Sequence, residues 1–87
     1  MKTYHLTVST PDGNVFDGEC VSLLVRGTEG ELAVMAGHIP FVTSLVSSDC
    51  SILLDDESVI RAYLTGGLLT VSDKETTLIA GSFKIKE

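Results

Sequence analysis

A period-two alternation of apolar and polar residues constrains this sequence more than any other feature. The alternation is clearest in residues 4–8, where Tyr4, Leu6 and Val8 are the apolar positions, and in residues 21–25. This period is typical of half-buried β-strands, whereas an amphipathic helix repeats about every 3.6 residues. Further strands are expected over residues 41–46, 50–54, 59–64, 68–72 and 76–80, with a last alternating segment at 83–85.

Turn-forming residues separate these segments. Pro11-Asp12-Gly13-Asn14 combines the fixed φ of proline with a glycine that can adopt positive φ. Residues 55–58 are expected to close a hairpin, Gly66-Gly67 to interrupt the strand pattern, and residues 73–75 to form another turn. Turns about 8–12 residues apart indicate an all-β sandwich or barrel. Because no linker is present, residues 1–87 are expected to form a single domain.

Length and charge exclude several classes of function. The chain has 87 residues, the size of one small domain. Six Lys and Arg residues oppose twelve Asp and Glu residues, and the resulting charge of −6 argues against nucleic acid or anionic lipid as a partner. The longest apolar run, residues 32–36, is far shorter than the about 20 residues of a membrane span. Met1-Lys2 begins no secretory leader, so an acidic, soluble domain inside the cell is expected.

Few residues could carry chemistry. Cys20 and Cys50 form no CxxC pair and lie in apolar segments, which favours free thiols in the core; one disulfide between them is the alternative that the spacing leaves open. His5 and His38 are the only histidines, so a histidine-rich metal site is impossible. The sequence contains no nucleophile elbow, Walker motif or calcium loop. We therefore expect no cofactor, no metal, no small-molecule ligand and no catalysis by this chain.

A free-standing carrier of the lipoyl or biotinyl kind, or an adaptor domain, is the alternative function. Carriers are small, acidic, all-β domains that present a modified lysine in an Asp-Lys-Ala hairpin, and Asp73-Lys74-Glu75 places Asp-Lys at an expected turn. However, Lys74 lies near the C-terminus rather than mid-chain, and Glu75 replaces the small residue. A solvated turn is therefore favoured, and a covalent adduct on Lys74 in the intact mass would support the carrier.

The segment from Gly27 to Phe41 is the most specific part of the sequence. It reads GTEGELAVMAGHIPF, and its glycines indicate backbone that turns with positive φ or passes close to another strand. Glu29, Glu31 and His38 are expected on or beside its loops, as an acidic surface with one titratable imidazole. The alternative interpretation is an ordinary hairpin whose loop carries polar residues without a binding role.

This segment resembles the signature of the epsilon subunit of bacterial F-type ATP synthase, in its N-terminal β-sandwich domain. The shared pattern is Gly-x-x-Gly-Glu-Leu-x-Val-Met-x-Gly-His-x-Pro-Phe. Three other stretches are similar to the family in the same order: Thr3-Tyr4-His5-Leu6, Phe16-x-Gly18-Glu19 and Leu64-Thr65-Gly66-Gly67-Leu68-Leu69-x-Val71. The resemblance therefore covers essentially all 87 residues.

The resemblance implies a small ten-stranded β-sandwich of two facing sheets, or flattened barrel, in the central stalk of the rotor. There it would be a non-catalytic subunit that links the gamma subunit to the membrane c-ring and helps couple proton transport to ATP synthesis. Its place would be peripheral, on the cytoplasmic face of the cell membrane. Carried over residue by residue, the resemblance implies that Gly30, Glu31 and His38 contact the polar loops of the c-ring, and that Thr10 and Thr43 contact gamma. A carboxylate at Glu31 suits ring loops that carry basic residues in the family.

Two features depart from the family pattern. Ala33 stands where glycine is usual, a change that a strand tolerates. The sequence also ends at Glu87, whereas the family commonly continues into a C-terminal helical hairpin that senses nucleotide and inhibits ATP hydrolysis. No residue here is expected to carry those roles. The end of the sequence carries no tag, which favours a natural short form over an excised domain.

Overall fold

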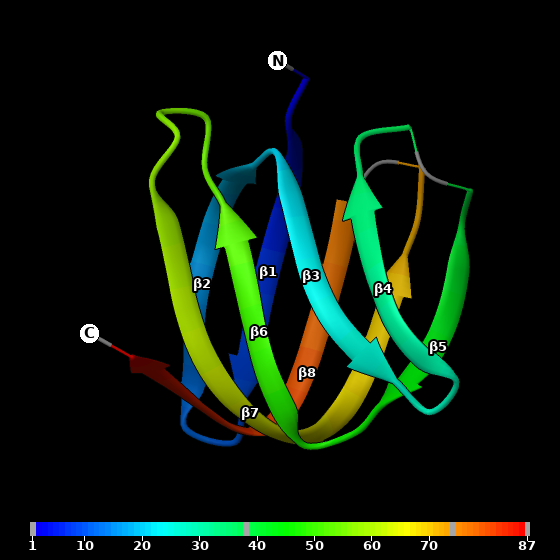
Figure 1. The fold of residues 1–87 in the computed structure, drawn as a ribbon, viewed down its shortest axis with the longest axis vertical. Coiled ribbons are helices and arrows are strands. Elements are labelled where there is room, and N and C mark those ends of the chain that lie inside the picture. Colours follow the sequence, from blue (N-terminus) through cyan, green and yellow to red (C-terminus); the bar gives the residue numbers. More distant parts are fainter. Residues whose placement is uncertain (1, 38, 74, 87) are drawn as a thin grey trace.

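The structure, a computed structural model, describes residues 2–37, 39–73 and 75–86, and these residues form eight β-strands (Figure 1). The strands are β1 (Tyr4–Thr10), β2 (Gly13–Cys20), β3 (Ser22–Gly27), β4 (Gly30–Met35), β5 (Phe41–Leu45), β6 (Ser48–Leu53), β7 (Val59–Val71) and β8 (Glu75–Lys86). The described residues include no helix that could cross a membrane.

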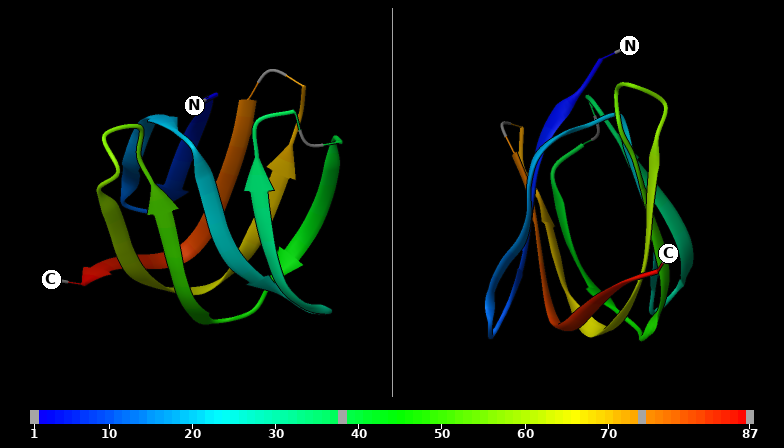
Figure 2. Two further views of the ribbon diagram at one scale, coloured as in Figure 1. Left: turned by 45° about the horizontal axis from the view of Figure 1, so that its top comes forward. Right: turned by 90° about the vertical axis from the view of Figure 1, so that its left-hand side faces the viewer.

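The strands share one hydrogen-bonded sheet that folds over on itself into two facing layers (Figure 2). The first layer contains β2, β1, the first half of β8, the second half of β7, and β5. The second layer contains the second half of β8, the first half of β7, β6, β3 and β4. On the other side of the sandwich, Gly27 of β3 pairs with Leu45 of β5 and connects the layers again.

Glycines allow β7 and β8 to bend from one layer into the other. In the β7–β8 register Thr65 pairs with Ser82 and Gly67 with Ala80, so the bend passes through position 66 and the residue opposite it. Gly66 has φ +25°, a conformation that residues with a side chain rarely adopt. A Cβ at Gly67 would overlap the carbonyl oxygen of Ile79. The close approach of the two backbones therefore requires glycine there.

The core lies between the layers and comes from alternate residues of the strands. Its buried apolar side chains are Leu6, Val8, Cys20, Leu23, Val25, Val34, Leu45, Cys50, Ile52, Ala62, Leu64, Leu69, Val71, Leu78, Ala80 and Phe83. Of the apolar positions predicted from the alternation in residues 4–8 and 21–25, Leu6, Val8, Leu23 and Val25 are in this core, whereas Tyr4 and Val21 are only partly buried. Both cysteines are free and buried, which confirms the expectation of core thiols.

The all-β sandwich is confirmed, but the described strands number eight rather than ten. The sequence predicts an interruption at Gly66-Gly67 and separate strands at 76–80 and 83–85, and both predictions are wrong, because β7 and β8 continue through their bends. Counting the two halves of each bent strand separately would give ten. The hairpin of residues 50–54 with 59–64 is confirmed as the β6–β7 pair.

Candidate functional site

Gly30 and Glu31 lie at the start of β4, next to the tight turn at Thr28 and Glu29 that joins β3 to β4. Gly30 has φ +122°, so the turn requires glycine there. A Cβ at Gly27 would lie 3.2 Å from a methyl carbon of Leu32. The glycines predicted to shape this segment therefore do so, and they leave Glu31 exposed at one end of the sandwich.

The connection between β4 and β5, whose described residues are 36, 37, 39 and 40, lies at the opposite end of the molecule (Figure 1). The six residues of β4 separate the two ends by roughly 17–20 Å. Ile39 is 77% exposed, and Gly37 has φ +85°. His38 itself lies outside the described residues. The structure thus brings Gly30 and Glu31 together and places the described neighbours of His38 far from them.

Thr10 and Thr43 occupy two separated places. The Thr10 hydroxyl accepts a hydrogen bond from the Asp12 N–H (3.2 Å) and donates one to the Gly13 carbonyl (3.3 Å), so it ties the β1–β2 turn together. Thr43 is half-buried on β5, on the same side of the strand as the buried Leu45. Two strands, β8 and β7, lie between β1 and β5 in the first layer, so the two threonines do not form one patch.

An exposed apolar patch lies on the outer face of the first layer. Val42 is 63% exposed, Leu68 is 41% exposed and Ile79 is 51% exposed. Leu68 sits directly opposite Ile79 on β8 and Ser44 on β5, and Val42 lies diagonally across from it. This patch could have been predicted from runs of consecutive apolar residues in β7 and β8. A strand that is apolar on both faces is usually covered on both, so such runs indicate a contact on the outer face. We call Val42, Leu68 and Ile79 the outer apolar patch.

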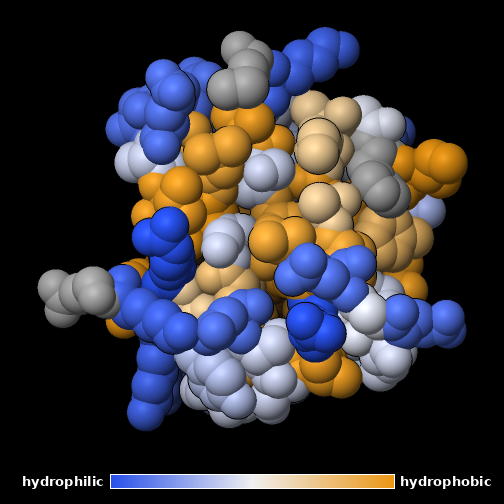
Figure 3. All heavy atoms as spheres, viewed as in Figure 1, coloured by the Kyte–Doolittle hydropathy of each residue, from blue (hydrophilic) through white to orange (hydrophobic). Residues whose placement is uncertain are grey.

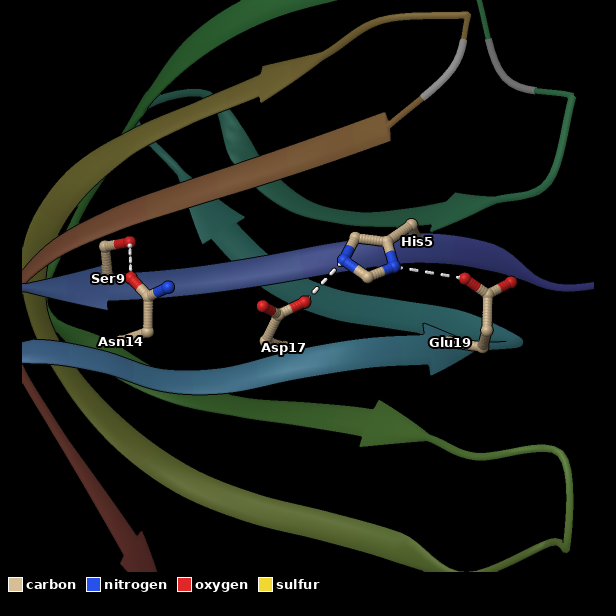
Figure 4. Close-up of polar contacts among 5 residues, drawn as sticks. All are labelled: His5, Ser9, Asn14, Asp17 and Glu19. Atoms are coloured by element: carbon tan, nitrogen blue, oxygen red, sulfur yellow. Dashed lines mark hydrogen bonds and ion pairs between the residues drawn. The ribbon is translucent and has the colours of Figure 1, made fainter.

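A histidine bridges two carboxylates on the β1–β2 pair (Figure 4). His5 Nε2 lies 2.5 Å from Asp17 Oδ1, and His5 Nδ1 lies 3.2 Å from Glu19 Oε2. The hydrogen bonds to Asp17 and then Glu19 raise the pKa of His5 above its usual value. Both ring nitrogens are engaged, and the structure offers no cluster of three metal-binding side chains among the residues it describes. The arrangement is thus an ion-paired clamp that joins the edge strand β2 to β1.

The open end of the sandwich near residues 36 and 37 holds a small cavity of about 180 Å³. Tyr4, Met35, Ser72 and Glu75 are among the residues that line it. Sites for drug-sized ligands or cofactors usually measure about 300–1,000 Å³ and are mostly apolar. The cavity is therefore too small for a cofactor of that size. Lys74, the lysine of the carrier alternative, lies outside the described residues.

Comparison with known proteins identifies relatives along nearly the whole chain. Residues 3–86 match the family described as the ATP synthase, Delta/Epsilon chain, beta-sandwich domain. The sodium ion specific ATP synthase epsilon chain of Acetobacterium woodii is 32% identical over 78 residues, which cover 90% of this chain and 59% of the relative. The ATP synthase epsilon chain of Ligilactobacillus salivarius is 29% identical over 82 residues, covering 94% and 59%. The chain thus spans about three-fifths of the length of these relatives.

Two solved structures share the fold. A chain in the mitochondrial ATP synthase OSCP/F1/c-ring structure of Euglena gracilis aligns with a TM-score of 0.91 at 20% identity, covering 95% of this chain and 53% of that one. A chain in the central stalk/c-ring structure of the Tetrahymena thermophila mitochondrial ATP synthase aligns with a TM-score of 0.77 at 14% identity, covering 94% and 66%. At these identities the likeness concerns the fold alone.

Proposed function

The chain belongs to the family of the β-sandwich domain of ATP synthase delta and epsilon chains, and we propose that it acts as a non-catalytic subunit of the enzyme's central stalk. In this role it links the gamma subunit to the membrane c-ring and helps couple ion transport to ATP synthesis. Relatives named as ATP synthase epsilon chains support the role. Its place is peripheral, on the cytoplasmic face of the cell membrane.

The observation that carries this proposal is the presence of two separate exposed surfaces on one continuous sheet. The outer apolar patch lies on the face of the first layer, and Gly30 and Glu31 lie at the β3–β4 turn of the second layer. Exposed apolar patches of this kind mark protein contacts. A body with two separated attachment surfaces suits a linker between two rotor components.

The two surfaces suit different partners. We assign Gly30 and Glu31 to the c-ring, whose polar loops carry basic residues in this family, because a carboxylate favours contact with cations. His38 does not join this assignment, since its described neighbours lie at the other end of β4. We assign Thr10 and Thr43 to the gamma side, together with the outer apolar patch. Thr43 lies on the same strand as Val42, and Thr10 lies next to Ser9, which pairs with Ile79. Thr43 shares its side of β5 with the buried Leu45, and the Thr10 hydroxyl is bonded within the β1–β2 turn, so both threonines neighbour patch residues and neither belongs to the patch itself.

The sandwich transmits force without bond chemistry of its own. A continuous ladder from β2 to β4 connects every described strand, and the bent β7 and β8 run through both layers. Dense packing between the layers makes such a body stiff. Rotation of the ring would therefore pass to gamma through this domain with little internal deformation.

Co-purification tests the proposal. The ATP synthase is isolated from washed membranes through a tag on the gamma subunit and is then run on a native gel. This chain is expected in the band that contains gamma and the c-ring, and its recovery only in the wash would show that the proposal is wrong. A Leu68→Lys variant should be lost from the complex, whereas Leu24→Lys, at a site of similar exposure on the other layer (38% against 41%), should be retained.

A further inference from the structure

The cations of this acidic protein are concentrated on one face. The chain has six Lys and Arg residues, and four of them, Arg26, Arg61, Lys84 and Lys86, are exposed on strands of the second layer. Only two acidic residues, Glu31 and Asp49, belong to the described strands of that layer. Figure 3 views this layer from outside and shows hydrophilic side chains crossing it beside apolar ones. The strands of this face therefore carry more cations than carboxylates, on a molecule whose net charge is −6.

Three of these cations meet where β7 and β8 pair. Arg61 lies directly opposite Lys86, and Lys84 lies directly opposite Tyr63. Arg61, Lys84 and Lys86 are exposed and alternate with inward-facing residues of the same strands, so they lie on the outer face. Tyr63 is 42% exposed among them. We call Arg61, Tyr63, Lys84 and Lys86 the basic patch.

The charges of the basic patch are only partly compensated. Lys86 Nζ lies 2.5 Å from Asp49 Oδ1 on β6, and among the described residues no ion pair joins Arg61 or Lys84 to a carboxylate. Like charges directly opposite each other across two strands destabilise a sheet. The Arg61–Lys86 pairing therefore works against the stability of the free domain, and an external anionic group would relieve it.

We propose that the basic patch binds an acidic polypeptide segment of another protein. Carboxylates of Asp and Glu would pair with Arg61 and Lys84, and Tyr63 offers an aromatic surface between them, as is common in protein contacts. The inference goes beyond the stalk role, and it does not depend on it. On the second layer β6 lies between β7, which carries Arg61 and Tyr63, and β3, so the patch and the β3–β4 turn are at least two strand spacings, about 10 Å, apart and both can be occupied at once.

The charge distribution favours a short acidic segment over an extended polyanion. The molecule measures 29 × 28 × 23 Å, and charges beyond about 8 Å are screened at physiological salt. A segment lying on the patch therefore interacts mainly with its cations. A membrane surface or a nucleic acid would also meet the acidic β6–β7 loop, where Asp55, Asp56 and Glu57 are all exposed. Repulsion from that loop opposes binding of either one.

Fluorescence polarisation with a labelled tetraglutamate peptide, about 13 Å long when extended, tests the proposal on the 87-residue chain. Binding at low salt is expected, and the double variant Arg61→Glu/Lys84→Glu should weaken it by about tenfold or more. The matched control is Arg26→Glu, a cation on β3 of the same layer, and it should change the affinity less than about twofold. Equal losses in the control and the double variant would overturn the proposal.

Two further measurements keep the result decisive. Amide NMR shifts of the wild-type chain, titrated with the same peptide, should move at residues 61–63 and 84–86; shifts confined to other strands would overturn the proposal even if the double variant failed to fold. Vesicles containing phosphatidylglycerol and a short single-stranded DNA serve as competing probes. Displacement of the peptide by either one at equal charge concentration would assign the patch to that class of polyanion instead.

Discussion

At the scale of single residues, polar groups on this sandwich are arranged by the two-residue period of the strands. His5, Asp17 and Glu19 are far apart in sequence, but the β1–β2 turn brings them to one outer face. The sequence predicts the turn at residues 11–14, yet it does not predict the clamp, because the exact pairing depends on an irregularity between Val8 and Ser9. The buried cysteines, in contrast, follow directly from their apolar surroundings.

The clamp predicts a pH-dependent contribution to stability. The carboxylates of Asp17 and Glu19 raise the pKa of His5, and Glu75 lies beside it in the register of β8. The contribution should therefore be fully present below the pKa of about 6.5 of an unfolded histidine, and it should disappear as the pH rises through the higher pKa of the folded state.

Urea unfolding from pH 5.5 to 8.5 measures this effect. The difference in unfolding free energy between the wild type and His5→Gln should shrink as the pH rises, and the contribution of His38, which both proteins contain, largely cancels. In an NMR titration Asp17→Asn should lower the pKa of His5 toward its usual value. A difference that stays constant with pH would contradict the prediction.

The two thiols should be unreactive in the native protein. Burial raises the pKa of Cys50 to about 11 and also raises the pKa of Cys20. Because the thiolate is the reactive form, modification of Cys50 by Ellman's reagent at pH 8 should be more than about a hundredfold slower than that of an ordinary exposed thiol. Val42→Cys supplies an exposed reference thiol, since Val42 is 63% exposed. Rapid reaction of two thiols in the folded wild type would show that this prediction is wrong.

At the scale of strands, local patterns predict hairpins better than they predict bends. The β6–β7 hairpin follows from alternation on both sides of a polar turn, and the structure confirms it. Gly66-Gly67 has the composition of a turn, but here it forms a bend inside one long strand. A turn and a bend at this position differ in long-range pairing. A bend requires β8 to pair with β7 both before and after Gly66-Gly67, as it does here. The sequence alone therefore cannot separate them.

The bend predicts a large cost for a single methyl group. In Gly67→Ala the added Cβ would overlap the backbone oxygen of Ile79, which cannot move without disturbing the β7–β8 ladder. We expect a loss of about 2 kcal/mol or more of unfolding free energy, measured by urea denaturation. Gly18→Ala is the matched control, because its nearest neighbour is a ring carbon of Phe16 at 3.7 Å, and it should cost less than about 0.5 kcal/mol. Similar losses in the two variants would contradict this account of the bend.

At the scale of the whole molecule, the function depends on which surfaces the fold separates. In the sequence, Gly30, Glu31 and His38 belong to one segment. In the structure, Gly30 and Glu31 begin β4, and the connection in which His38 falls follows the other end of that strand. The parallel pairing of β1 with β8 and the closure of β3 onto β5 join residues far apart in sequence. Such pairings leave no local pattern. The outer apolar patch and the basic patch therefore become visible only once the sheet is assembled.

The proposed c-ring contact predicts that charge reversal at one end of the sandwich weakens assembly. Glu31 is exposed beside the β3–β4 turn, so Glu31→Lys should leave the domain folded while replacing attraction to basic ring loops with repulsion. We expect association with c-ring membranes to weaken by on the order of 1 kcal/mol or more, about fivefold in affinity. Asp55→Lys makes the same change of charge at the opposite end and should bind like the wild type, which separates a local contact from the effect of net charge. A sedimentation assay with membranes stripped of the endogenous subunit measures both variants. The assay compares the two ends of one folded domain. Equal binding of Glu31→Lys and the wild type would show that the β3–β4 turn does not contact the ring. The other end of the sandwich would then be the alternative ring-facing surface.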